Sequence, residues 1–249
     1  MTRHTKLFRS KLSAELATDT EVEKLLLREY GSVFVAGPGV VAPRKIVFAD
    51  QADVLSFQES VDVMSAQIGG FQMELQTAAT QGLLSAISEA EACGLTISPR
   101  AADSARRDYD GTVELWKSRV EPALDHWVKQ GKLNQIEADH VRSLSPFEQV
   151  PVVLGLEAKG LWFAKDLSKS IIYSVAPPGT SQHLAMLAFD VKEFDDARVR
   201  EILAWNGWFQ TVVSDLPHFT YLGVAETDLT DLGLKRVASG EQTFWVPDL

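Results

Sequence analysis

The last ninety or so residues consist of short apolar runs separated by turn-forming residues, and this pattern limits the folds open to the chain. The runs at 169–175, 183–191 and 208–213 have the length of strands, and residues 197–207 have the spacing of an amphipathic helix. Gly207 is expected to end that helix, because glycine readily takes the left-handed conformation that follows helix C-termini. Strands this few and short predict a small, mainly antiparallel sheet within an α+β fold.

The preceding part of the chain is dominated by helical spacing, and we predict a mostly helical N-terminal half. Helices are expected within three segments: 12–29, 52–93 and 101–130. Asp19 or Thr20 can cap a helix in the first segment. Pro122 is expected to begin a new helix in the third, because proline lacks the N–H group that a helix interior requires. Short strands are expected at 31–37, 45–50 and 95–98.

Composition narrows the classes of function. The chain has 249 residues, a formal net charge of −10 and one cysteine, Cys93. A single cysteine excludes an intrachain disulfide and a cysteine-rich zinc site, and Cys93 itself is expected to be buried as a small apolar side chain. The acidic balance argues against nucleic acids and anionic membranes as partners.

The chain also lacks the sequence signals of export or membrane insertion. Its longest apolar runs are far below the length of a membrane span, and no apolar core of a signal peptide follows the basic N-terminus. A cytoplasmic location is therefore the default expectation, with a misassigned start codon or another export route left open.

Two pairs of a histidine and an acid lie at the ends of predicted strands. His183 and Asp190 bracket the apolar run LAMLAF, where an unpaired carboxylate would be costly. Asp215 and His218 follow the strand predicted at 208–213, with a proline shaping the turn between them. Each strand end could direct one imidazole and one carboxylate into a cleft. The competing interpretation is that both pairs are capping or ion-pair groups.

These residue types suit a catalytic zinc ion. Such an ion is held by three protein ligands, two imidazoles and one carboxylate being a known set, and a further carboxylate can take a proton from a water molecule. His183, Asp190 and His218 supply the ligands, and Asp215 supplies the base. A zinc site in a cleft beside the small sheet, with Zn²⁺ as the cofactor, is therefore one interpretation of these residues, and capping or ion-pair roles are the other.

The same residues resemble the motifs of the zinc D-alanyl-D-alanine carboxypeptidase superfamily, whose fold the Hedgehog signalling domain shares. The family pattern S-x-H-x-x-G-x-A-x-D falls in register on Ser181, His183, Ala188 and Asp190, and His218 matches the histidine of the later E-x-W-H pattern. The resemblance implies the same three zinc ligands. It also implies that Ser181 is a turn residue beside the substrate, which helps to orient a ligand.

Three positions depart from the family pattern. Met186 stands where the family has glycine, Asp215 where it has the glutamate that acts as general base, and Pro217 where it has tryptophan. Aspartate is one methylene group shorter than glutamate, so its carboxylate reaches the metal only if the turn lies closer. The missing tryptophan removes one wall of the cleft unless another aromatic residue replaces it. These changes threaten activity more than metal binding.

The family also carries an arginine, in an S-G-Y-R-S segment, that holds the terminal carboxylate of the substrate. The similar segment here is SARRDYDGT, in which Ser104 and Arg107 have the required spacing. Arg107 is therefore the expected substrate-binding arginine, with Arg106 and Arg100 as alternatives, because a guanidinium group binds carboxylates in a bidentate manner. A solvated ion pair with the neighbouring aspartates is the competing interpretation.

The resemblance covers roughly residues 75–223. It implies a DD-peptidase-like metal-binding domain over 75–249, with residues 1–74 as a helical and stranded extension packed on it, or else one continuous domain. The implied activity is that of a zinc metallopeptidase or amidase that uses an activated water to hydrolyse D-amino-acid-containing peptides of the peptidoglycan type. The alternative is a catalytically inactive metal-binding member of the same fold that serves as a binding or scaffold protein.

Overall fold

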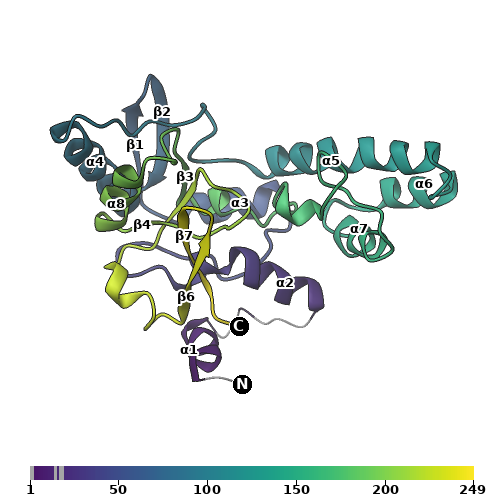
Figure 1. Cartoon of the computed structure of the whole chain (residues 1–249), viewed down its shortest axis with the longest axis horizontal. Coiled ribbons are helices and arrows are strands. Elements are labelled where there is room, and N and C mark those ends of the chain that lie inside the picture. The colour runs from purple at the N-terminus through teal and green to yellow at the C-terminus, as the bar shows by residue number, and fades with distance from the viewer. Residues whose placement is uncertain (1–2, 14–15, 17–19) are drawn as a thin grey trace. The chain divides into compact units, whose positions relative to one another are not determined.

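The computed structural model describes residues 3–13, 16 and 20–249, with the backbone alone for residues 3–6. Helices and short antiparallel strands make it an α+β protein, as predicted (Figure 1). The chain divides into two compact units. Unit 1 comprises residues 1–46, 55–107 and 182–249, and unit 2 comprises residues 47–54 and 108–181. The expected domain boundary between residues 74 and 75 stays a prediction.

The elements are short, and many lie far apart in the sequence from the elements they contact. The helices are α1 (Arg3–Lys11), α2 (Glu21–Tyr30), α3 (Gln51–Glu59), α4 (Thr77–Ala92), α5 (Tyr109–Lys129), α6 (Gln135–Ser143), α7 (Gln149–Glu157) and α8 (Ala197–Trp205). The strands are β1 (Val63–Ile68), β2 (Phe71–Gln76), β3 (Ala188–Asp190), β4 (Trp208–Gln210), β5 (His218–Tyr221), β6 (Leu234–Ser239) and β7 (Gln242–Pro247). Short 3₁₀ helices are η1 (Gly31–Val35), η2 (Ile171–Tyr173), η3 (Gln182–Ala185) and η4 (Glu226–Asp228).

Three small antiparallel sheets belong to unit 1: the hairpin β1–β2, the sheet β3-β5-β4 and the hairpin β6–β7. In the three-stranded sheet, Asp190 of β3 lies directly opposite His218 of β5, and Phe189 lies opposite Phe219. Residues opposite each other in an antiparallel pair project from the same face. The register therefore places the Asp190 carboxylate and the His218 imidazole side by side.

The core of unit 1 packs α4 and α8 against this sheet. Helix α4 presents small apolar residues to the core, including Ala79, Leu83 and Ala86, all fully buried. Gly82 lets α4 approach closely, because a Cβ atom there would lie 2.8 Å from the Tyr221 ring and 2.9 Å from the Asn206 carbonyl oxygen. This close packing holds the strands that carry the histidine–acid residues.

Unit 2 is helical, and two of its helices begin with side-chain caps. Asp108 caps α5 by accepting a hydrogen bond from the Gly111 amide, and Asn134 forms a reciprocal capping box with Glu137 at the start of α6. Pro122 lies inside the single long helix α5, so the expected second start there is wrong. The helix continues because its apolar side chains are buried on both sides of the proline, which outweighs one missing hydrogen bond.

Several expected strands do not form. Residues 31–35 and 171–173 are 3₁₀ helices, and 45–50 and 95–98 contain no strand. The segment 52–93, expected to be mostly helical, contains the β1–β2 hairpin. Short apolar runs fit several backbone conformations, and the surrounding packing decides among them.

The missed hairpin had a recognisable turn signal in the sequence. Gly69 and Gly70 connect β1 to β2 with φ values of 58° and 87°. Two residues with positive φ between alternating segments are typical of a tight hairpin turn.

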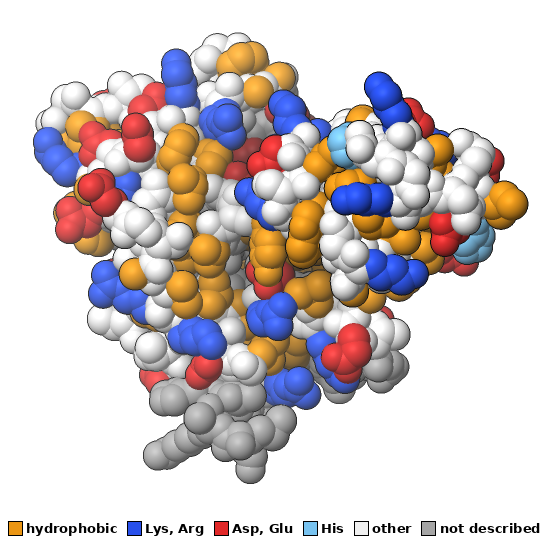
Figure 2. Space-filling model, turned by 45° about the vertical axis from the view of Figure 1, so that its right-hand side comes forward, with side chains coloured by type: hydrophobic (Ala, Val, Ile, Leu, Met, Phe, Trp, Pro, Cys, Tyr) orange, Lys and Arg blue, Asp and Glu red, His pale blue; other side chains and the backbone are white. Residues whose placement is uncertain are grey.

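The surface mixes charged and apolar side chains. Figure 2 shows basic and acidic side chains interspersed with apolar ones on the face in view. Cys93 is exposed rather than buried, because it follows α4 at the helix end instead of facing the core. Within the part of the chain that the structure describes, each helix is too short or too polar to cross a lipid bilayer.

Candidate metal centre

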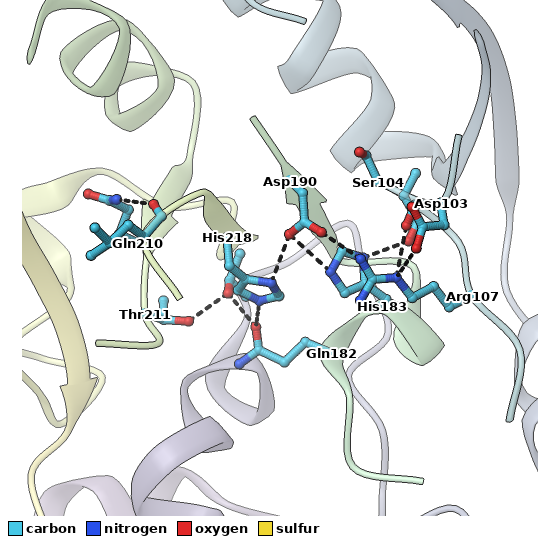
Figure 3. A network of polar contacts seen from close by, with 12 residues as sticks. Asp103, Ser104, Arg107, Gln182, His183, Asp190, Gln210, Thr211 and His218 are labelled. Carbon is cyan, nitrogen blue, oxygen red and sulfur yellow. Dashed lines mark hydrogen bonds and ion pairs between the residues drawn. The ribbon is translucent and has the colours of Figure 1, made fainter. Parts of the chain in front are cut away.

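The structure brings His183, Asp190 and His218 together, with one potential ligand atom from each lying within 4.8 Å of the other two (Figure 3). Asp190 ends β3, His218 begins β5, and His183 lies on η3. All three side chains belong to unit 1 and are buried. They form a buried cluster that could bind a metal ion.

The distances within this cluster suit tetrahedral coordination. Oδ1 of Asp190 lies 3.2 Å from Nε2 of His183 and 3.3 Å from Nδ1 of His218. Ligand atoms about 2.0–2.1 Å from a tetrahedral ion are separated by about 3.3 Å. The two distances to Asp190 therefore match a single ion, and the two imidazole nitrogens lie within 4.8 Å of each other.

Two of these atoms have no hydrogen-bond partner among the described residues. They are Nε2 of His183 and Oδ1 of Asp190, and each exposes less than 1 Å² to solvent. Their 3.2 Å separation would permit an ion pair with a protonated His183, but the contact does not have the geometry of a hydrogen bond. A buried unsatisfied polar group costs about 1–3 kcal/mol. An ion bound between these atoms would remove that cost, so the residues present fit a metal.

A hydrogen bond from Nδ1 of His183 to the backbone leaves its Nε2 atom available to bind a metal. Nδ1 of His183 lies 2.7 Å from the carbonyl oxygen of Ala105. A carbonyl oxygen can only accept, so Nδ1 carries the hydrogen and Nε2 keeps its lone pair, which points toward Asp190. The loop that contains Ala105 thus selects the tautomer of His183 that can bind a metal.

Gln182 has the same effect on His218. Nε2 of His218 lies 2.9 Å from Oε1 of Gln182, and the hydroxyl of Thr220 donates to the same oxygen. The amide nitrogen of Gln182 donates to the carbonyl of Tyr30 at 2.8 Å, which fixes the orientation of the amide. His218 therefore donates through Nε2 and presents the lone pair of Nδ1 to the cluster. Sequence reasoning missed Gln182, although a polar side chain beside a candidate ligand was a usable signal.

Arg107 holds the second oxygen of Asp190. Its Nη2 atom lies 2.6 Å from Oδ2 of Asp190, and its Nε atom donates to the Asp103 carbonyl at 2.8 Å. The Asp190 amide donates to the carbonyl of Ser104 at 2.9 Å. Residues 103–107 thus anchor the carboxylate so that only Oδ1 faces the two imidazoles (Figure 3). The role of Arg107 toward a substrate stays a prediction.

The electrostatics of the cluster favour the metal-binding protonation states. Burial lowers the pKa of His183 below its ordinary value, although Asp190 opposes this. Burial acts to raise the pKa of Asp190, but the positive charge that His183 and His218 carry when protonated holds it well below its usual range. Both directions favour a neutral imidazole and an ionised carboxylate, which are the forms that coordinate metals.

Met186, which stands where the resembled motif has glycine, has an unusual backbone conformation. Its φ angle is 54°, in the left-handed region, and its side chain is fully buried. This conformation costs a residue other than glycine about 1–2 kcal/mol. It reverses the chain between η3 and β3, so that His183 and Asp190 return to the same place.

The other predicted site residues lie outside the cluster of three. Asp215 is exposed in the turn between β4 and β5, and its carbonyl accepts from the His218 amide at 3.1 Å. Ser181 is half-buried and lies two residues before His183. Arg106 binds Glu74 and Gln58 instead of the cluster. The roles of Asp215 as general base and of Ser181 beside a substrate stay predictions.

Comparison with protein-family models found no match to this sequence, and a search of curated proteins found none either.

Proposed function

We propose that the chain is a zinc-dependent peptidase or amidase of the D-alanyl-D-alanine carboxypeptidase type, acting on D-amino-acid-containing peptides. The observation that carries this proposal is the convergence of three donor atoms, two of them buried without a hydrogen-bond partner. The substrate class comes from the motif resemblance alone.

The donor set favours zinc over the harder cations. Two imidazole nitrogens and one carboxylate oxygen are typical zinc ligands, whereas calcium and magnesium prefer sites made of oxygen atoms. Bound there, a zinc ion would act as a Lewis acid toward a carbonyl group and lower the pKa of a water molecule. His183, Asp190 and His218 would hold it, leaving one position open for water or substrate.

Side chains of the protein would carry out the proton transfer and would position the metal ligand. We assign the transfer of the water proton to Asp215, which precedes the ligand His218 by three residues. Because the Asp215 carboxylate is exposed in a turn, it can accept a proton and release it to solvent or to the leaving amine. Arg107 fixes Asp190 and thereby keeps one carboxylate oxygen directed at the metal position.

Metal analysis followed by peptide hydrolysis tests the proposal. The purified protein is expected to bind one zinc ion, measured by atomic emission, and to release D-alanine or D-glutamate from a panel of D-Ala-D-Ala and L-Ala-D-Glu peptides. Asp215→Ala should retain zinc and lose turnover, while Asp231→Ala, at another exposed acid, should change neither. Failure to bind zinc would refute the proposed site, and full activity of Asp215→Ala would refute the base.

Two observations favour a second function. The donor atoms of His183 and Asp190 are almost inaccessible to solvent, and Arg107 forms an ion pair with the other carboxylate oxygen of Asp190. These features suit a metal-binding protein without turnover, acting as a binding or scaffold protein. One zinc ion bound tightly, with no hydrolysis of any peptide in the panel, would support this alternative.

A further inference from the structure

A pocket is lined by residues of α8, the β6–β7 hairpin and the three-stranded sheet. Its volume is about 340 Å³, within the range typical of small-molecule sites. Phe219 and Gln210, which are paired across β5 and β4, line it. Side chains alternate along a strand, so Phe219 projects from the face opposite to its neighbour His218. The pocket is therefore separate from the metal centre, and Gln210 lies apart from that cluster in Figure 3.

One stripe of α8 supplies groups that are free to bind a ligand. Arg198, Glu201 and Trp205 are three and four residues apart, so they share a face of the helix. The side chains of Arg198 and Glu201 are exposed and form neither a hydrogen bond nor an ion pair with any described residue. Trp205 is 71% exposed, which is unusual for so large an aromatic side chain.

The opposite wall is amphipathic and already ordered. Arg236 of β6 faces Trp245 of β7, and its Nη2 donates to the Thr243 hydroxyl at 3.3 Å. The indole nitrogen of Trp245 donates to Glu226 at 3.2 Å. Trp208 lies behind this wall and is fully buried. The pocket therefore has aromatic surfaces and a rim of guanidinium, carboxylate and hydroxyl groups.

The charge of the lining indicates the class of ligand. Three arginines and three glutamates line the pocket, so their formal charges cancel. A strongly charged ligand would meet as much repulsion as attraction, whereas a neutral molecule with many hydroxyl groups can bond to both signs. Aromatic rings favour a ligand that also has an apolar face. We propose that this pocket binds a neutral saccharide, stacked on Trp205 and bonded through its hydroxyl groups to Arg198 and Glu201.

Titration with neutral oligosaccharides tests the proposal. Maltotriose, cellotriose and triacetylchitotriose are added at millimolar concentrations, and binding is followed by tryptophan fluorescence and calorimetry. At least one is expected to bind, and Trp205→Ala should weaken that binding by about tenfold or more. Glu201→Gln should weaken it less, because an amide keeps one acceptor oxygen. Trp205 is exposed, so its replacement should leave the circular dichroism spectrum unchanged.

The matched control is Trp162→Ala, at another tryptophan with an exposed surface, and it should not alter binding. Affinity should also be equal in the zinc-loaded and chelator-treated protein, so the result does not depend on the proposed hydrolase activity. The proposal is overturned if no saccharide binds, if Trp205→Ala binds as well as the wild type, or if inorganic phosphate binds in place of the saccharides.

Discussion

Two buried carboxylates in this protein have opposite surroundings. Glu157, in unit 2, accepts hydrogen bonds from the Ser170 hydroxyl at 2.5 Å, the Ile171 amide at 2.7 Å and the Phe163 amide at 3.2 Å. Asp190, in unit 1, has one oxygen on an arginine and the other facing two imidazole nitrogens. Both are less than 10% exposed.

The difference shows what distinguishes a structural acid from a candidate ligand. Each donor around Glu157 comes from the loop that follows α7, so the carboxylate completes a local structure. Around Asp190, Oδ1 remains without a donor, and two imidazole lone pairs point toward it. Burial raises the pKa of Glu157 because no cation offsets it, whereas the two histidines lower the pKa of Asp190. A buried carboxylate oxygen without a hydrogen-bond donor, rather than burial alone, therefore distinguishes the candidate metal ligand Asp190 from the structural acid Glu157.

The largest expected effect is on zinc affinity, which should depend on Asp190 and not on Glu157. Asp190→Asn should weaken zinc binding by more than about a hundredfold, because a neutral amide replaces the charged ligand. Glu157→Gln, the same chemical change at the structural acid, should leave zinc affinity unaltered. Calorimetric titration of both variants measures the contrast. Equal zinc affinity in the two variants would remove the basis for distinguishing them.

The reverse contrast is expected in stability. Glu157→Ala should lower the free energy of unfolding by about 2–4 kcal/mol, because it leaves the Phe163 and Ile171 amides and the Ser170 hydroxyl without their acceptor. Glu114→Ala, which removes an exposed ion pair with Lys117, should change it by less than about 1 kcal/mol. Urea unfolding measures both. A Glu157→Ala protein as stable as the control would show that these hydrogen bonds contribute little.

A smaller effect is expected from the residue that anchors Asp190. Arg107→Gln should weaken zinc binding by about 10–100-fold, because the carboxylate loses the group that orients it. Arg106→Gln is the matched control, since the neighbouring arginine binds Glu74 and Gln58 instead. Zinc titration of the two variants sharpens the comparison. The assignment fails if both variants bind zinc with wild-type affinity.

The smallest expected effect is the pH dependence of stability in the chelator-treated protein. The pKa of His183 is lowered from the ordinary 6.5, so the unfolded chain takes up this proton first as the pH falls. Stability should therefore decline as the pH falls below about 6.5, and Asp190 adds a further loss below about 3.8. The raised pKa of Glu157 acts oppositely, with stability lost as the pH rises from 4.5 through the folded-state value.

Urea midpoints measured across this pH range check those signs. His183→Ala should flatten the decline below pH 6.5, and His140→Ala, at an exposed histidine, should preserve it. A slope that is the same in His183→Ala and the wild type would contradict the assignment.

The sequence alone identified the three clustered residues, because His183, Asp190 and His218 flank apolar runs that were predicted to be strands, although His183 itself lies on η3. It could not supply Gln182, Ala105 or the position of Arg107, whose contacts join segments far apart in the chain. The α+β class and the helices with capping residues also followed from local pattern. The strands expected at 31–37 and 95–98 did not, since short apolar runs have no unique conformation.

The amino-acid pattern by itself determined which residues could bind a metal and that short antiparallel strands would carry Asp190 and His218, whereas His183 lies on a 3₁₀ helix. Only the tertiary structure decided which nitrogen of each imidazole faces the carboxylate and which atoms remain unsatisfied. It also placed Arg198, Glu201 and Trp205 beside the β6–β7 hairpin. The physical reason is that local propensity depends on neighbours along the chain, whereas tautomers, ligand geometry and pockets depend on contacts between segments that are distant in sequence.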